Sequence, residues 1–99
     1  MQGDYLLRIP EGVVSLIRNL HPLIKADVKA GLHSLVQNPD SGKALKEELH
    51  GLRSYRIKRY RVIYRIVAPE KIMEIVAIGP RKNIYEETFK IISRKKMNK

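Results

Sequence analysis

The 99-residue chain contains no cysteine, no tryptophan and a single phenylalanine. The lack of cysteine excludes a disulfide scaffold, a thiolate zinc site and a cysteine nucleophile. No run of about 18 apolar residues is present, and no apolar run follows a basic N-terminus, so neither a membrane span nor a secretory signal is predicted. We therefore expect a cytoplasmic protein without membrane contacts, folded as one domain over residues 1–99.

Patterns that hold metals or cofactors are missing as well. His21, His33 and His50 lie far apart in the chain and lack the spacing of metal ligands. The chain also has no glycine-rich phosphate loop and no nucleophile-elbow motif. The sequence therefore predicts no metal and no cofactor.

Acidic side chains are scarce in the second half of the chain. Residues 1–50 carry six basic and six acidic side chains, whereas residues 51–99 carry fourteen basic and four acidic ones and hold the whole net charge of +10. The window between Glu48 and Glu70 has no acidic residue and six cations: Arg53, Arg56, Lys58, Arg59, Arg61 and Arg65. Solubility does not require the positive charges to be concentrated in one half of the chain. Their concentration indicates a polyanion or an acidic protein as partner.

The periodicity of the first half predicts a short strand followed by two helices. Residues 5–9 form the strand, which ends at Pro10. The apolar residues from Glu11 onward recur every three or four positions, as on one face of a helix. The His21-Pro22 step interrupts this pattern, because the residue before a proline avoids the helical region. Pro22 then begins a second helix, which ends at the turn-forming residues 38–42.

In the second half the apolar period becomes two, which predicts strands over residues 52–57, 60–67 and 72–78 joined by short turns. Residues 43–51 are expected to form a loop or one helical turn. A final helix follows from Asn83, with residues 93–99 as a frayed basic tail. The order strand–helix–helix–strand–strand–strand–helix predicts a small α+β domain with a helical hairpin packed on a mainly antiparallel sheet.

The hairpin register places arginines opposite each other. A two-residue turn at Lys58-Arg59 sets Arg56 directly across from Arg61, a pairing of like charges that destabilises a sheet. The opposite face is then apolar and is predicted to form core: Tyr55, Ile57, Tyr60, Val62, Tyr64 and Ile66. A slip of one residue would bury the arginines at great cost. We therefore expect an anion on the arginine face, and phosphate is the best match for guanidinium groups.

Two segments resemble the RelE/ParE superfamily of toxin–antitoxin toxins. Residues 49–66 read Leu-His-Gly-Leu-Arg-Ser-Tyr-Arg-Ile-Lys-Arg-Tyr-Arg-Val-Ile-Tyr-Arg-Ile and resemble its leucine-glycine followed by Tyr-Arg-Val-Gly-x-Tyr-Arg-Val-Ile-Tyr. Residues 78–85 read Ile-Gly-Pro-Arg-Lys-Asn-Ile-Tyr and resemble its Gly-His-Arg-x-x-x-Tyr ending. The predicted order of elements agrees with this family over essentially the whole chain.

The resemblance implies a ribosome-dependent endoribonuclease that cleaves messenger RNA by metal-free attack of the 2′-hydroxyl. Four residues match the family's catalytic positions: Arg56, Arg61, Arg81 and Tyr85. Further cations are expected to bind RNA: Arg53, Lys58, Arg59, Arg65 and Lys82. Arginine does not act as a base because its pKa exceeds about 12, so proton transfer would fall to Tyr85 or Lys58.

The chain departs from the family pattern at two positions. Lys58 stands at a turn position usually given to glycine, and Pro80 stands where histidine is frequent. A histidine at that position would have been the readiest acid or base near neutral pH, so its replacement weakens an ordinary acid–base pair.

The resemblance leaves two other functions open. A ParE-like member would inhibit DNA gyrase and need no nuclease site, and a decayed homologue would bind RNA or ribosomes without toxicity. The resemblance also implies an antitoxin partner, with DNA reached only through the toxin–antitoxin complex. From the charge distribution we expect the antitoxin to bring an acidic, partly disordered segment that folds on binding to the basic half.

Overall fold

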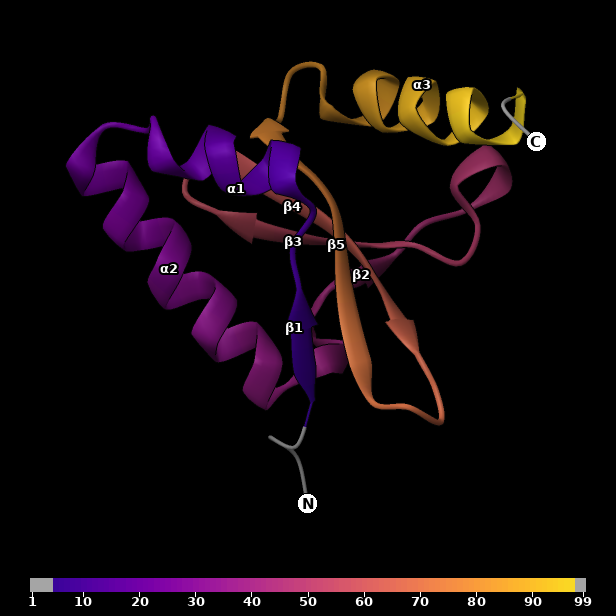
Figure 1. Cartoon of the computed structure of the whole chain (residues 1–99), viewed down its shortest axis with the longest axis horizontal. Coiled ribbons are helices and arrows are strands. Elements are labelled where there is room, and N and C mark those ends of the chain that lie inside the picture. The colour runs from indigo at the N-terminus through magenta and orange to yellow at the C-terminus, as the bar shows by residue number, and fades with distance from the viewer. Residues whose placement is uncertain (1–4, 98–99) are drawn as a thin grey trace.

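The computed structural model describes residues 5–97 and contains a five-stranded sheet and three α-helices (Figure 1). The elements in chain order are β1 (Leu6–Arg8), α1 (Glu11–Arg18), α2 (Pro22–Gln37), β2 (Lys43–Ala44), β3 (Arg53–Ile57), β4 (Tyr60–Val67), β5 (Ile72–Pro80) and α3 (Ile84–Met97), with 3-10 turns at Pro39–Ser41 and Glu47–Leu49. The helices and strands confirm the predicted α+β class. No helix within residues 5–97 is long and apolar enough to cross a membrane.

The strand order is β1-β5-β4-β3-β2, and β3, β4 and β5 form the predicted antiparallel meander. The sheet is mixed because β1 pairs with β5 in parallel, with Leu6 opposite Ile72. At the other edge, the prediction for residues 43–51 was incomplete. The two-residue β2 pairs with β3 before a 3-10 turn begins at Glu47.

The two helices of the first half begin where the sequence predicts. Pro22 is the first residue of α2, and the His21 ring caps this helix because its Nδ1 accepts a hydrogen bond from the Leu23 amide at 3.2 Å. α3 extends to Met97, so the first part of the predicted frayed tail is helical, whereas residues 98–99 lie outside the described residues.

The β3–β4 hairpin has the predicted register. Ile57 lies opposite Tyr60 and Arg56 opposite Arg61, so Lys58 and Arg59 form a two-residue turn. Lys58 has φ of 56°, in the left-handed region that favours glycine. This backbone angle is the physical reason that related hairpins would prefer glycine at this position.

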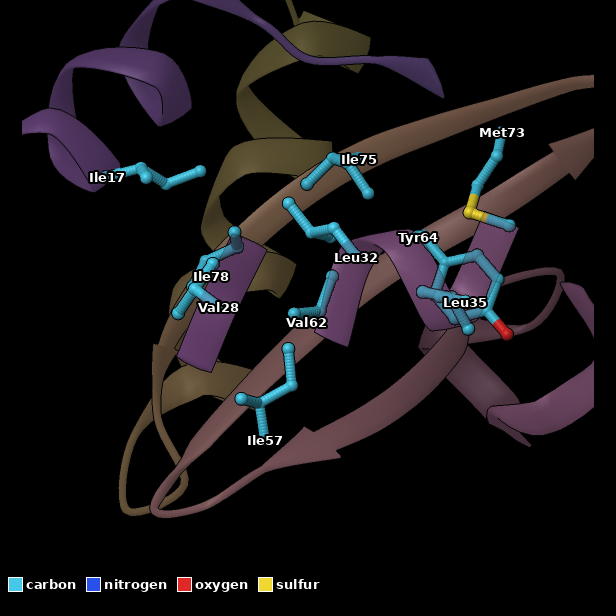
Figure 2. Packing of buried hydrophobic residues seen from close by; sticks show 10 residues of the cluster. All are labelled: Ile17, Val28, Leu32, Leu35, Ile57, Val62, Tyr64, Met73, Ile75 and Ile78. Atoms are coloured by element: carbon cyan, nitrogen blue, oxygen red, sulfur yellow. The ribbon is translucent and has the colours of Figure 1, made fainter. Parts of the chain in front are cut away.

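The predicted apolar face of the hairpin packs beneath α1 and α2. Val28, Leu32 and Leu35 of α2 lie over Val62 and Tyr64 of β4 (Figure 2). The remaining buried members of this cluster are Ile17, Ile57, Met73, Ile75 and Ile78. At Gly31 the helix comes so close to β3 that an added Cβ would overlap the Ile57 side chain. The strand alternation therefore identified this core correctly.

Tyr64 is the one large residue of this core with a hydroxyl to satisfy. It is fully buried, and its hydroxyl donates a hydrogen bond to the Pro39 carbonyl at 2.6 Å and accepts one from the Gly42 amide at 3.0 Å. Burial raises the pKa of this hydroxyl above its ordinary value, because the charged form would lose its hydration. Gly42 leaves room for the hydroxyl, since a Cβ there would overlap it. Tyr64 thus fixes the 39–42 loop to the sheet.

The second face of the sheet is not simply lined by arginines, which corrects the sequence-based expectation. α3 covers part of this face and buries a small apolar cluster of Leu52, Ile63, Ala77 and Ile84. Ile91 and Ile92 pack against the cluster, and Thr88 of the same helix is buried. Arg56 and Arg61 lie at the hairpin end of this face, whereas Arg65 lies further along β4, opposite Glu74.

Candidate active site

The cross-strand pair of Arg56 and Arg61 forms the centre of the candidate site. The two residues lie directly opposite each other at the second residue pair from the turn. Arg56 is exposed, and its Nε donates a hydrogen bond to the Lys58 carbonyl at 3.3 Å. Two guanidinium groups on neighbouring strands repel each other, so the pair costs stability unless an anion lies between or above them.

Arg61 is half-buried and incompletely satisfied. Its Nε is a buried donor without a hydrogen-bond partner among the described residues. Buried donors in proteins are nearly always paired, so an unpaired one indicates a group that completes the site. A phosphate oxygen has the charge and geometry to accept from this donor.

The chain end of β5 brings Arg81 to the same place. Tyr60 pairs with Pro80 across the sheet, and the Arg81 amide donates to the Arg59 carbonyl of the hairpin turn at 3.1 Å. Four exposed cations surround this junction: Lys58, Arg59, Arg81 and Lys82. Within residues 5–97, none of these four, nor Arg56 or Arg61, forms an ion pair with a carboxylate. We call these six cations the hairpin cation cluster.

Tyr85 reaches the second face from the first turn of α3. Its hydroxyl lies 3.1 Å from the Ser54 hydroxyl, and Ser54 is buried on β3 opposite Ile63. Because side chains alternate along a strand, Ser54 shares its face with Arg56. The hydrogen bond therefore fixes the Tyr85 ring over the arginine-bearing face, two positions along β3 from Arg56.

Ser54 is a site residue that the sequence analysis did not single out. Its place on the arginine face followed from the alternation of the strand, but nothing in the sequence connects it with a tyrosine thirty-one positions away. The signal that could have identified it is a small polar residue that shares the predicted arginine face with Arg56 and Arg61.

Two of the predicted RNA-binding arginines lie elsewhere and have partners. Arg53 donates to the Gly42 carbonyl at 2.8 Å and lies 3.8 Å from the Asp40 carboxylate. Arg65 binds the Glu74 carboxylate at 2.6 Å, and Arg8 joins the same carboxylate at 3.6 Å. Arg65 is four residues along β4 from Arg61, which corresponds to roughly 13 Å. The structure therefore does not bring these two arginines into the hairpin cation cluster.

The site brings several cations together and offers few groups for proton transfer. Guanidinium groups stay charged at any physiological pH and stabilise a phosphorane-like transition state electrostatically. Pro80 stands at the end of β5, where related chains often have a histidine, and a proline side chain carries no proton to transfer. Tyr85 and the lysines are therefore the side chains of the site that remain for proton transfer. No group of three or more potential metal ligands is found in the described part of the chain.

Comparison with protein families agrees with this architecture. Residues 13–85 match the sequence model of a family described as ParE toxin of type II toxin–antitoxin system, parDE. No curated protein sequence matches the chain.

Solved structures with the same fold include several toxins. The toxin–antitoxin complex RelBE2 from Mycobacterium tuberculosis matches at 30% identity, over 78% of this chain and 98% of the other, with a TM-score of 0.71. The archaeal RelE–RelB complex from Pyrococcus horikoshii matches at 25% identity, over 79% and 96%, with a TM-score of 0.65. A mutant of E. coli toxin RelE in the free state shares the fold at 15% identity, over 92% and 96%, with a TM-score of 0.72.

Proposed function

The chain belongs to the RelE/ParE family of toxins of type II toxin–antitoxin systems, and we propose that it acts as an endoribonuclease that cleaves messenger RNA on the ribosome. The observation that supports this activity is the hairpin cation cluster. Arg56 faces Arg61 without a carboxylate partner, and the buried Nε of Arg61 has no hydrogen-bond partner among the described residues. A ParE-like toxin, which needs no nuclease site, would not need this arrangement for catalysis.

In the proposed reaction the RNA supplies its own nucleophile. The 2′-oxygen attacks the adjacent phosphorus, a bond forms between them, and the bond from phosphorus to the 5′-oxygen breaks. The products are a 2′,3′-cyclic phosphate and a 5′-hydroxyl, with one proton removed from the 2′-hydroxyl and one delivered to the leaving oxygen. Arg61 and Arg81 stabilise the negative charge that develops on the non-bridging oxygens.

Proton transfer is assigned to Tyr85 or Lys58. The Tyr85 hydroxyl is held over the arginine face by Ser54, and Lys58 lies at the tip of the hairpin next to Arg59. Phenols and primary amines are, as classes, less effective acid–base catalysts near neutral pH than imidazole. Much of the rate enhancement must therefore come from how the substrate is positioned.

From this weakness we predict a strict dependence on the ribosome. The purified protein is expected to cut translated messenger RNA at least about a hundredfold faster than the same RNA free in solution, because the ribosome would hold the 2′-oxygen in line with the scissile bond. Primer extension on one transcript, with and without initiating ribosomes, measures both rates. Equal cutting of both RNAs would contradict the proposal.

The family match also favours a second candidate, inhibition of DNA gyrase, because the matching sequence model is that of the ParE toxins. Expression of the protein in cells, followed by assays for DNA breaks and for RNA cleavage, distinguishes the two functions. Gyrase-dependent DNA breaks without RNA cleavage would support the ParE-like function. Growth without either lesion would identify a non-toxic homologue.

The antitoxin is the expected protein partner, and we propose that an acidic segment of it covers the hairpin cation cluster. We predict that the association rate constant falls at least about tenfold between low ionic strength and about 0.15 M, where screening shortens the field to about 8 Å. Stopped-flow mixing across this range measures the effect. A rate constant that does not change with salt would rule out electrostatic attraction to the cluster.

A further inference from the structure

A small pocket lies at the tip of the β3–β4 hairpin, on the face that α2 covers. Its volume is about 300 Å³. Two residues of α2 and four residues of the hairpin line it: Ile24, Asp27, Ile57, Lys58, Arg59 and Tyr60. Lys58 and Arg59 also belong to the hairpin cation cluster. The pocket therefore lies beside the proposed active site, around the hairpin tip from Arg56 and Arg61.

The walls of this pocket suit a flat aromatic ring. Ile57 is buried, and Ile24 and Tyr60 are half-buried against the core beneath α2. Tyr60 lies directly opposite Ile57 across the hairpin, so an aromatic ring and two branched apolar side chains meet here. Unpaired bases of RNA are commonly bound by stacking on an aromatic side chain. The pocket therefore offers a place for one such base.

Asp27 is the one acidic residue of the pocket. It is half-buried and lies one helical turn after Ile24 on α2. Within residues 5–97 its carboxylate forms neither an ion pair nor a hydrogen bond, although Lys58 and Arg59 line the same pocket. Polar groups that are partly withdrawn from water are normally paired, so this carboxylate indicates a ligand that brings N–H donors.

Guanine fits a carboxylate better than the other three bases of RNA. Its Watson–Crick edge carries two adjacent donors, the N1–H and the N2 amino group, which match the two oxygens of a carboxylate. Adenine and cytosine place a ring-nitrogen acceptor beside their amino group, and a carboxylate repels this acceptor. Uracil flanks its single N–H donor with two carbonyl oxygens, which a carboxylate repels in the same way.

We propose that this pocket binds an unpaired guanine of the RNA, with the base stacked on Tyr60 and its Watson–Crick edge on the Asp27 carboxylate. Lys58 and Arg59 bind the phosphate of the same nucleotide. An RNA strand that continues around the hairpin tip then arrives at Arg56 and Arg61. This inference rests on the proposed function, because RNA is the substrate of that reaction, and it adds a residue that selects the sequence.

An arginine side chain of a protein partner also presents two parallel N–H donors, but the charges of the pocket disfavour it. Asp27 would attract its guanidinium group, whereas Lys58 and Arg59 would repel it. A guanine nucleotide satisfies both kinds of charge, because its neutral base meets the carboxylate and its phosphate meets the cations. RNA is therefore the better ligand for this pocket.

Binding of RNA that cannot be cleaved tests the pocket apart from catalysis. The probes are single-stranded hexanucleotides of 2′-O-methyluridine with either a guanine or an adenine at one central position, and the methyl groups remove the 2′-nucleophile. We expect the chain to bind the guanine probe at least about tenfold more tightly, because a bidentate contact to a base edge discriminates by this much. Fluorescence anisotropy of labelled probes measures both affinities. Equal affinities would overturn the proposal.

Asp27→Asn tests the carboxylate. The amide keeps the size of the side chain but has one acceptor oxygen in place of two, so the preference for guanine should fall below about twofold. The control Glu70→Gln removes the same charge from the exposed turn after β4, outside the pocket, and should keep the preference. The ratio of the two affinities is compared, because loss of an acidic group strengthens RNA binding at any position. A preference that survives in Asp27→Asn would overturn the proposal.

Tyr60 is tested by a second pair of variants. Tyr60→Leu removes the ring and should weaken binding of the guanine probe at least about fivefold, whereas Tyr60→Phe keeps the ring and should change it less than about twofold. Circular dichroism verifies that both variants fold. Equal binding by the leucine and phenylalanine variants would show that the base does not stack on Tyr60 and would overturn the proposed pose.

Guanosine 5′-monophosphate as a competitor distinguishes a free nucleotide from RNA. The mononucleotide should bind at least about tenfold more weakly than the guanine probe, because only the longer strand also reaches Arg56 and Arg61. Equal affinities would overturn the assignment to RNA and identify a site for free nucleotides.

The pocket and the nuclease fail independently in these experiments. A chain that prefers the guanine probe through Asp27 but leaves translated messenger RNA intact would overturn the proposed cleavage and support the pocket. A chain that cuts messenger RNA on ribosomes but binds both probes equally would support the nuclease and overturn the pocket.

Discussion

Replacing Arg61 or Arg81 by alanine is expected to lower ribosome-dependent RNA cleavage by about 10²–10³-fold and to abolish growth arrest. Each guanidinium contributes charge-assisted hydrogen bonds that are strongest when negative charge develops on the phosphate. Stability should change little. Arg81 is exposed, and truncation of Arg61 removes both a repulsive neighbour of Arg56 and an unpaired buried donor. Primer extension and a circular dichroism melt on each variant measure the two quantities.

Arg18→Ala is the matched control for this experiment. Arg18 is an exposed arginine in the last turn of α1, on the opposite side of the sheet from the arginine-bearing face. It removes the same charge and should leave toxicity unchanged. Full growth arrest by both the Arg61 and Arg81 variants would eliminate the proposed site. A loss of activity in the Arg18 variant would show that net charge alone is responsible.

The largest expected effect on stability comes from Tyr64→Phe, which should destabilise the fold by about 2–4 kcal/mol. The substitution keeps the ring in the core but removes the hydroxyl, so the Gly42 amide and the Pro39 carbonyl lose their hydrogen-bond partner. Each buried polar group left unpaired costs about 1–3 kcal/mol. For a domain of this size the melting temperature should fall by roughly 10–20 °C.

Tyr60→Phe provides the comparison. Tyr60 is half-buried at the start of β4, and no hydrogen bond of its hydroxyl is found in the described structure, so its loss should cost less than about 0.5 kcal/mol. If the two variants melt at the same temperature, the hydroxyl of Tyr64 does not hold the 39–42 loop.

The raised pKa of Tyr64 adds a pH dependence to the same comparison. In the unfolded chain this hydroxyl ionises near pH 10, whereas in the folded chain it stays neutral to a higher pH. Ionisation therefore lowers the free energy of the unfolded state first, so the contribution of Tyr64 to stability is complete below pH 10 and declines above it. Denaturant titrations at several pH values should show a steeper loss above pH 10 for the native chain than for Tyr64→Phe.

The hairpin could be predicted in detail because its information is local. Alternation over residues 52–67 distinguishes two faces, and the cost of burying arginines eliminates the other register. The opposing arginines, the turn and the first-face core followed from these two facts. The start of α2 was equally local, since Pro22 and the cap at His21 lie next to each other in the chain.

The features that the sequence did not reveal depend on distant partners. The parallel pairing of β1 with β5 joins residues 6–8 to residues 72–74, and β2 is only two residues long. The position of α3 on the second face hides part of the surface expected to carry arginines. The partners of Arg53 and Arg65 are acidic residues in other elements, so charge alone did not separate these arginines from the hairpin cation cluster.

The pairing of Leu6 with Ile72 has a kinetic consequence. β1 can pair only after β5 has been synthesised, and the contact between them closes a loop of about two thirds of the chain. Contacts of this separation slow folding and place the completion of the sheet late. During synthesis, the chain would remain without its β1–β5 pair, and without Arg81 and Tyr85, until most of it had been translated. A toxin arranged in this way becomes active only after its own message has been read almost to the end.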